Sequence, residues 1–390
     1  MRSGALSGSL PFGARLAGRM RQREVQAQIV FCVLLAALVW GFIQAASGIE
    51  GRGGAQSGFG FLREHASFEL GESLIPFQAG DTYFRAFLVG LLNTVKVAVC
   101  GIILSTILGL VIALGQLSPS ILAARLCRLY VEVFRNMPLL LQLIFWHTFL
   151  LRGLPAVRQA LSPVEGVYLT NRGLYVPAIA PDPAYLPMLL ALVAGLALSI
   201  LLRHMARQRD GVIAPKWRLA MIFGPPLAVF LAYGAPFSLD MPALAGFNFK
   251  GGWTLTPEFA AMVIGLTLYT AAFNAEIIRA GIQGVAKGQT EAGLSLGLRR
   301  SQIMRLIVIP QTFRIITPPM TNSYLSLTKE SSLAVAIGYP EVVRVANITL
   351  SETNRSIECI ALIMIIYLML SLLISALLNV VNARVQMQHR

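Results

Sequence analysis

A polar segment interrupts the apolar C-terminal third of the chain and is the first candidate for chemistry. The stretch EAGLSLGLRRSQIMRLIVIP, from Glu291 to Pro310, contains one glutamate, two glycines four residues apart and three arginines. A carboxylate near the start of a helix and guanidinium groups near its end both suit the helix dipole. We therefore predict a short helix between Gly288 and Arg300 with Thr290 as its N-cap.

The two glycines of this segment, Gly293 and Gly297, would share one helix face at a spacing of four. Bare glycine surface lets another backbone approach closely, although each glycine costs about 1 kcal/mol relative to alanine within a helix. Leu294 and Leu298 form another stripe, which suits insertion into the groove of a partner. The alternative is an ordinary loop helix packed on its own protein, and the residues alone leave both open.

Further polar groups lie inside apolar runs, where they are costly and usually face a cavity or a partner. Glu276 either pairs with Arg279 or contacts substrate amino groups or forms an inner gate. The stretch RIITPPM from Arg314 to Met320 contains adjacent prolines, which predict a kinked or broken span that lines a pathway or merely fits its neighbours. The pathway or gate candidates are Asn93, Asn136, Asn274, Glu276, Asn322 and Lys329.

The elements that position these residues follow from composition. Of the 390 residues, 56% are hydrophobic and 13% are charged, whereas roughly a quarter are charged in a soluble domain. The net charge is +14, and the basic residues cluster in the short segments between apolar runs. This distribution indicates membrane topology rather than binding of nucleic acid. The four cysteines show no C-x-x-C spacing and the histidines no H-E-x-x-H spacing, so no disulfide framework or metal site is predicted.

Apolar runs near the ~20 residues needed to cross a bilayer predict an all-α membrane protein with about eight transmembrane helices. The first run is interpreted as a retained helix rather than a signal peptide, because it is long and lacks a good cleavage site. Of the 32 basic residues, 19 fall on one side of the spans and 9 on the other, which places both termini in the cytoplasm. The spans are 27–46, 86–114, 123–151, 186–202, 219–236, 258–282, 305–328 and 357–382.

Several enzyme classes lack their motifs in this sequence. No G-x-x-x-x-G-K-[ST] is present, so the chain cannot hold ATP phosphates in the P-loop manner. G-x-S-x-G and an intramembrane Asp pair are also missing, and we predict no catalytic residue. A stand-alone ion-coupled secondary transporter of small polar solutes remains the alternative to an ATP-driven one, although such proteins usually show internal repeats.

The polar segment resembles the signature of permease subunits of binding-protein-dependent ABC importers. That signature reads E-A-A, three residues, G, nine residues, I-x-L-P. Two positions depart from it conservatively, because Gly293 replaces the second Ala and Ile309 replaces Leu. The matching positions are Glu291, Ala292, Gly293, Gly297, Ile307, Ile309 and Pro310.

Neighbouring sequences extend this resemblance over most of residues 60–385. YTAAFNAEIIRAGIQGVAKGQTEAGLSLGL and IPQTFRIITPPMTNSYLSLTKESSLAVAIGYPEVV are similar to the polar amino acid branch of the family. VEVFRNMPLLLQLIFW and NRGLYVP resemble its Q-type permease of the general L-amino acid transporter.

The resemblance implies a five-helix type I importer core with one extra N-terminal helix and a two-helix insertion. The core is 86–151 and 258–382, with a coupling (EAA) loop at 283–304, and the insertion with its periplasmic loops is 152–257. The flanking parts are a basic cytoplasmic segment at 1–26, the extra helix at 27–46, a periplasmic segment at 47–85 and a cytoplasmic C-terminus at 383–390.

The resemblance also implies an assembly in the bacterial cytoplasmic (inner) membrane. Its members would be a second permease subunit of a different chain, two cytoplasmic ABC ATPase subunits that bind ATP and Mg, and a periplasmic amino-acid-binding protein. This chain would carry no cofactor, and L-amino acids would be the substrate. The residues implied to contact the ATPase are Thr290, Glu291, Ala292, Gly293, Leu294 and Gly297.

Overall fold

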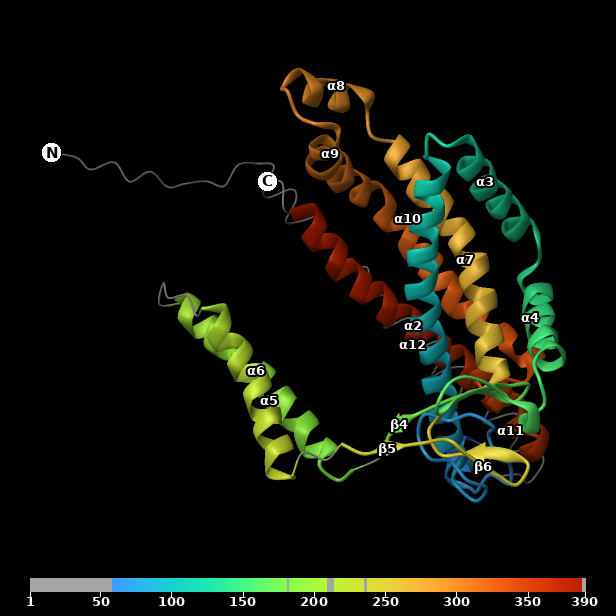
Figure 1. Cartoon of the computed structure of the whole chain (residues 1–390). Coiled ribbons are helices and arrows are strands. Elements are labelled where there is room, and N and C mark those ends of the chain that lie inside the picture. The colour runs from blue at the N-terminus through green and yellow to red at the C-terminus, as the bar shows by residue number, and fades with distance from the viewer. Residues whose placement is uncertain (1–57, 181, 209–213, 235–236, 388–390) are drawn as a thin grey trace. The chain divides into compact units, whose positions relative to one another are not determined.

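The computed structural model describes residues 58–180, 182–208, 214–234 and 237–387 (Figure 1). The first expected span, 27–46, lies outside the described residues. The chain forms two compact units, one of residues 1–127 with 273–390 and one of residues 128–272. Two helices, α3 (Ile121–Asn136) and α7 (Pro257–Gln283), contribute residues to both units.

Long apolar helices build the first unit. α2 (Tyr83–Gln116) begins after Thr82, whose hydroxyl accepts the Arg85 N–H at 3.3 Å. Its own apolar residues are distributed around the whole circumference of the helix, as a membrane span requires. α10 (Ile309–Glu330) and α12 (Ser356–Met387) pack on each other, and α11 (Val342–Thr353) packs on α2 and α12. The short elements are η1 (Phe59–Arg63), α8 (Lys287–Ser295), α9 (Arg300–Ile303), η3 (Met304–Val308) and η4 (Ser331–Ile337).

Within the described residues, four helices are long and apolar enough to cross a membrane, or five if one bent pair is a single span. The four correspond to the runs expected at 86–114, 186–202, 258–282 and 357–382. The bent pair, Arg300–Ile337 and Val342–Thr353, contains the run at 305–328 and is bent by 48°. The runs at 123–151 and 219–236 contain the shorter apolar helices Leu139–Gly153 and Trp217–Ala232.

The bend in this pair does not lie where the prolines predict it. α10 continues without a break through Pro318 and Pro319. The chain leaves the helical path later, at Gly338, whose φ of 82° is a left-handed conformation that glycine adopts without steric cost. The expected break at these prolines is therefore wrong, and the alternative of a kink there stays a prediction.

The run expected at 123–151 forms two helices, α3 and α4 (Leu139–Gly153), instead of one. Pro138 lacks an N–H and disfavours helical geometry at the residue before it, which ends α3. The buried Gln142 side chain donates to the carbonyls of Phe134 and Met137 at 3.1 and 3.0 Å, so the break leaves these carbonyls satisfied.

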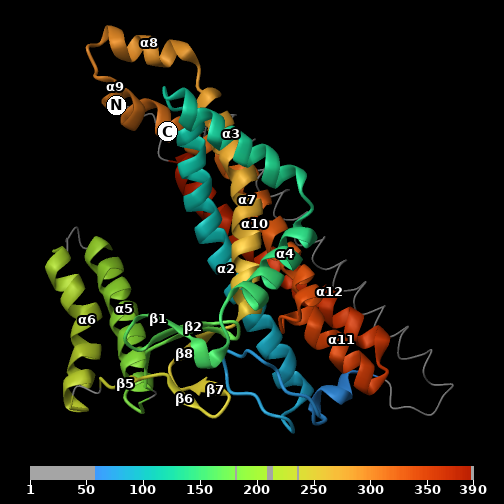
Figure 2. The ribbon, with the colours of Figure 1, turned by 45° about the vertical axis from the view of Figure 1, so that its right-hand side comes forward.

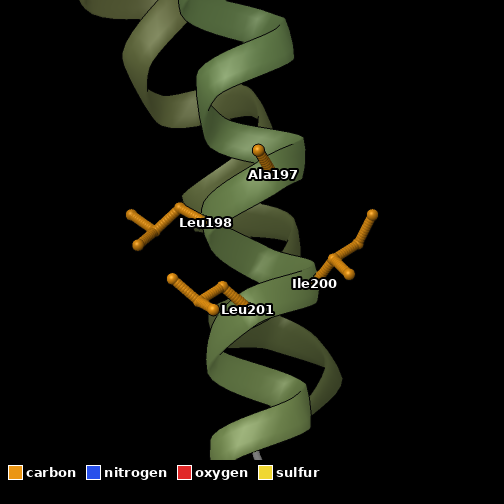
Figure 3. A pocket seen from close by; sticks show the side chains of 4 residues that line it. All are labelled: Ala197, Leu198, Ile200 and Leu201. Atoms are coloured by element: carbon orange, nitrogen blue, oxygen red, sulfur yellow. The ribbon is translucent and has the colours of Figure 1, made fainter.

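The insertion contains a helical hairpin of α5 (Tyr185–Gln208) and α6 (Pro215–Ala232). Gly195 makes their close approach possible, because a Cβ there would lie 2.4 Å from the Met221 carbonyl oxygen. The outer surface of α5 is apolar. Exposed side chains of Ala197, Leu198, Ile200 and Leu201 project away from this helix (Figure 3).

Short antiparallel strands, which the sequence did not predict, flank this hairpin. β1 (Leu161–Val164), β2 (Val167–Thr170), β3 (Gly173–Val176) and β8 (Trp253–Leu255) form one sheet in that order. β4 (Ala178–Ile179) pairs with β5 (Leu239–Asp240), and β6 (Ala243–Ala245) pairs with β7 (Asn248–Lys250). Their small core consists of Val157, Tyr175 and Phe249, with Tyr168 stacked on Phe249 at 4.4 Å.

Candidate functional site

The predicted connector helix is present as α8, and it starts earlier than expected. Ala286 is its N-cap and forms no side-chain cap hydrogen bond, so the assignment of Thr290 as the N-cap is wrong. Thr290 and Glu291 lie within the helix, and the Glu291 carbonyl accepts the Ser295 hydroxyl at 3.1 Å. Both views show α8 beyond the ends of α2 and α10 (Figures 1 and 2).

Gly297 ends α8 instead of sharing its face with Gly293. Its φ is 76°, its N–H donates to Leu294 O at 2.9 Å, and the Leu298 N–H donates to Gly293 O at 3.1 Å. These two bonds are the pattern of a Schellman C-cap, which favours glycine at this position. A Cβ at Gly297 would meet nothing within 4 Å. The left-handed backbone conformation therefore explains this glycine within the chain.

Gly293 does allow a close approach, but the neighbour belongs to the same chain. A Cβ at this buried position would lie 2.9 Å from Ile303 Cγ1 and 3.2 Å from Ile307 Cδ1. Ile303 closes α9 and Ile307 lies in η3, a π-helical turn. Gly293 therefore seats α8 on its own chain.

The outward surface of α8 combines charge with exposed leucines. Leu294 is 47% exposed and Leu296 is 79% exposed, on a helix whose remaining residues are small or polar. Glu291 and Ala292 are exposed as well. Exposed large apolar residues on a short polar helix mark a surface for another protein. Sequence reasoning did not select Leu296, although it directly precedes Gly297.

The π turn η3 connects α9 to α10 immediately before Pro310. The Ile309 N–H donates to Met304 O, five residues back. Pro310 cannot donate to the preceding turn, and a wider turn there lets the chain continue as α10. Single π turns of this kind are frequent at functional sites.

Among the expected pathway residues, Asn274 and Glu276 form polar links between helices of the first unit. Asn274 is fully buried, donates to Ser105 Oγ at 3.3 Å and accepts the Ser323 hydroxyl at 2.7 Å. Glu276 accepts from Arg279 at 2.6 Å and from Gln116 at 3.0 Å. The pair with Arg279 is the simpler of the two alternatives for Glu276, and the structure contains it.

Asn93 lies in a second polar network at the opposite end of α2. It is fully buried and donates at 2.9 Å to the carbonyls of both Glu72 and Pro340. The Glu72 carboxylate forms an ion pair with Lys96, and these side chains are only 8% and 10% exposed. Sequence reasoning did not find Glu72, because it lies outside the apolar runs.

Two further residues of this end were also missed. Glu341 is fully buried, and its carboxylate caps α11 by accepting the N–H groups of Val343 and Arg344, each at 2.8 Å. Glu352 accepts the Tyr83 hydroxyl at 2.8 Å. The signal for Glu341 is its position directly after a Gly-Tyr-Pro turn and before an apolar run, where an N-cap is expected.

The other expected pathway residues are exposed. Asn136 is the last residue of α3, in a part of the helix that belongs to the second unit. Asn322 and Lys329 lie on α10, and spacings of four, four and three place them in one exposed stripe with Pro318 and Ser326. A polar stripe on a span faces water or another protein, because lipid would leave it unsatisfied.

No group of three or more His, Cys, Asp or Glu side chains within the described residues could hold a metal ion. The polar clusters above are occupied by hydrogen bonds between helices.

Comparisons with known proteins found sequences that are similar over most of this chain. Residues 101–387 match the model of the binding-protein-dependent transport system inner membrane component. The general L-amino acid transport system permease protein AapQ of Rhizobium johnstonii is 42% identical over 95% of this chain and 94% of its own. The putative amino-acid ABC transporter permease protein YhdX of Escherichia coli is 43% identical over 93% of this chain and 94% of its own.

Two further proteins are similar over most of the chain. The glutamate/glutamine/aspartate/asparagine transport system permease protein BztB of Rhodobacter capsulatus is 40% identical, covering 95% of each chain. A solved structure of an amino acid ABC transporter with histidines aligns with 77% of this chain and 95% of that chain, at 24% identity and a TM-score of 0.47.

Proposed function

Since the chain belongs to the family of binding-protein-dependent transport system inner membrane components, we propose that it is the permease subunit of an ATP-binding cassette importer of L-amino acids. The observation that carries the proposal is α8. This connector between two spans presents Leu294 and Leu296 to its surroundings at 47% and 79% exposure. Two exposed leucines on a polar connector suit insertion into a groove of a protein partner.

The partner of α8 is a separate ATPase subunit, which binds ATP and Mg. This chain lacks a P-loop, so the energy of hydrolysis has to enter through a contact between subunits. Glu291, Ala292 and Leu294 form the docking surface. Gly293 and Gly297 act from behind that surface, one by seating α8 on Ile303 and the other by ending the helix.

The subunit lies in the bacterial cytoplasmic membrane with both termini and α8 on the cytoplasmic side. The apolar helices of the described residues support the membrane location. The excess of Lys and Arg on the α8 side of the spans supports the orientation. A periplasmic amino-acid-binding protein then delivers substrate on the opposite side of the membrane, where the topology expected from the sequence places the loops of the insertion.

The amino-acid path runs along the polar stripe of α10, and a second permease subunit of a different chain closes its other side. Asn322, Ser326 and Lys329 are exposed on this helix. The ammonium group of Lys329 suits the carboxylate that all amino-acid substrates share. Asn93, Asn274 and Glu276 hold helices together, and we assign them to the scaffold of the path.

Reconstitution tests this function. The chain is purified with its second permease and ATPase, placed in proteoliposomes, and supplied with binding protein, labelled amino acid and ATP. ATP-dependent uptake is expected. The double variant Leu294→Asp/Leu296→Asp should lose the ATPase on purification, because charge replaces the apolar contact, while Leu294→Met/Leu296→Met keeps it. Uptake by this chain alone, driven by a proton or sodium gradient, would overturn the proposal.

A further inference from the structure

The β6–β7 hairpin of the insertion presents an aromatic side chain at its tip. Ala245 pairs with Asn248, so Gly246 and Phe247 form a two-residue loop. Gly246 has a φ of 69°, as the first loop residue of a type II′ turn requires. Phe247 therefore occupies the second loop position, and its side chain is 77% exposed.

The base of this hairpin is anchored, so the tip is held in a defined place. Phe249 is buried against Val157 and Tyr175. The Tyr175 hydroxyl donates to Asn248 Oδ1 at 2.7 Å and ties the hairpin to β3. A rigid support lowers the entropy lost when an exposed aromatic residue binds a partner.

Two arginines surround the tip. The Arg158 guanidinium lies over the Phe247 ring at 5.8 Å from its centroid, and Arg172 donates to the Phe247 carbonyl at 3.2 Å. Both arginines are exposed, and neither forms an ion pair with a carboxylate within the described residues. We call Phe247, Arg158 and Arg172 the hairpin-tip cluster.

Two aspartates of the insertion bind backbone groups. Asp240 accepts the Gly252 N–H at 2.8 Å, and Asp182 accepts the Ala184 N–H at 2.8 Å. Lys250, on β7 of the same hairpin, is exposed and adds a third cation. The hairpin-tip cluster therefore combines an aromatic anchor with positive charge.

We propose that the hairpin-tip cluster is a docking site for an acidic surface of the periplasmic amino-acid-binding protein. The inference rests on the proposed function, since that function places the insertion on the periplasmic side. Charge complementarity selects an acidic partner. Aromatic residues and arginines are also the side chains that dominate the energy of protein interfaces.

The test measures ATP hydrolysis by the complete transporter in lipid nanodiscs. The probe is the periplasmic binding protein that stimulates the wild-type complex, titrated with its amino acid bound. Phe247→Ala is expected to raise the half-stimulating concentration by roughly tenfold, as the loss of an anchor does. Leu244→Ala, at an exposed apolar position of the same hairpin, should leave it unchanged.

Charge is tested separately. The double variant Arg158→Glu/Arg172→Glu should raise the half-stimulating concentration further than Phe247→Ala does. It should also weaken the salt dependence of that concentration, because both arginines act through complementary charge. A half-stimulating concentration of Phe247→Ala within twofold of wild type would overturn the docking site. An effect of Phe247→Ala seen in phosphatidylglycerol nanodiscs and lost in phosphatidylcholine nanodiscs would assign the cluster to lipid instead.

The proposed function fails in a different way. A wild-type complex that no binding protein stimulates, or that carries no ATPase, overturns both proposals together. A wild-type complex that is stimulated, with Phe247→Ala stimulated equally, overturns the docking site alone.

Discussion

The two ends of the first unit are held by different interactions. At the α11 end, the Glu72–Lys96 ion pair, the Asn93 amide and the Glu341 carboxylate connect α2, α11 and the segment before α2. At the α8 end, the packing of Gly293 depends on the apolar side chains of Ile303 and Ile307. Buried polar groups therefore join elements at the α11 end, whereas α8 itself is seated on apolar side chains, although the Gln116–Glu276 hydrogen bond links α2 to α7.

This difference separates a fixed end from an end that can be displaced. Buried polar groups must keep their partners, because an unpaired one in a low dielectric is costly. Apolar contact is non-directional and tolerates a shift of the contacting surfaces. We therefore expect the α11 end to preserve the geometry of the helices, and α8 to pass on movement.

The largest expected effect comes from breaking the ion pair. Lys96→Met leaves the Glu72 carboxylate buried without its cation, and such a loss typically costs about 3–5 kcal/mol. The thermal midpoint of the purified complex in detergent should fall sharply. The double variant Lys96→Met/Glu72→Leu should recover much of it. A single variant with an unchanged midpoint would show that the α11 end does not depend on this pair.

A smaller effect is expected from filling the glycine seat of α8. Gly293→Val places methyl groups where a Cβ alone would lie 2.9 Å from Ile303, and overpacking of this kind costs about 1–3 kcal/mol. The thermal midpoint should fall slightly, while uptake per ATP hydrolysed falls several-fold because α8 is displaced. Gly293→Ala should have a weaker effect in the same direction. If Gly293→Val and wild type take up equal amounts of substrate per ATP hydrolysed, the packing of Gly293 on Ile303 has no role in coupling.

The smallest expected effect comes from the C-cap. Gly297→Val forces a β-branched residue into a left-handed conformation at a cost of about 1–2 kcal/mol, whereas Gly297→Asn adopts that conformation more readily. Hydrogen exchange of α8 should rise more for Val than for Asn. Since a Cβ at Gly297 meets nothing within 4 Å, equal effects of Asn and Val would point to a direct contact with the partner instead.

Most of the helical architecture follows from sequence pattern, and the corrections have local causes. α2 and α12 are long apolar runs, and their lengths alone predict spans. Pro138 divides the run at 123–151, and this effect of proline is readable from sequence. Pro318 and Pro319 nevertheless lie within α10. The strands of the insertion were missed because each has only two to four residues.

The candidate site was predictable in outline but not in detail. The pattern around Glu291 identified α8. The way in which α8 ends became clear only from the positive φ of Gly297 in the structure. The same glycine pattern could not tell a close contact from a helix end, because both favour glycine. The structure was also needed to choose among the polar pathway candidates. Asn93 and Asn322 look alike in sequence, but the first is buried and the second is exposed.

The sequence by itself determined the membrane class, the helical connector and the absence of a P-loop, because these depend on composition and local spacing. Tertiary structure decided which polar groups are partners. The Asn93 amide meets Pro340, 247 positions away, and Gln116 meets Glu276, 160 positions away. Local propensity carries no information at such separations. Only the packing of helices brings these atoms within hydrogen-bond distance, and that packing separates the scaffold from the exposed stripe of α10.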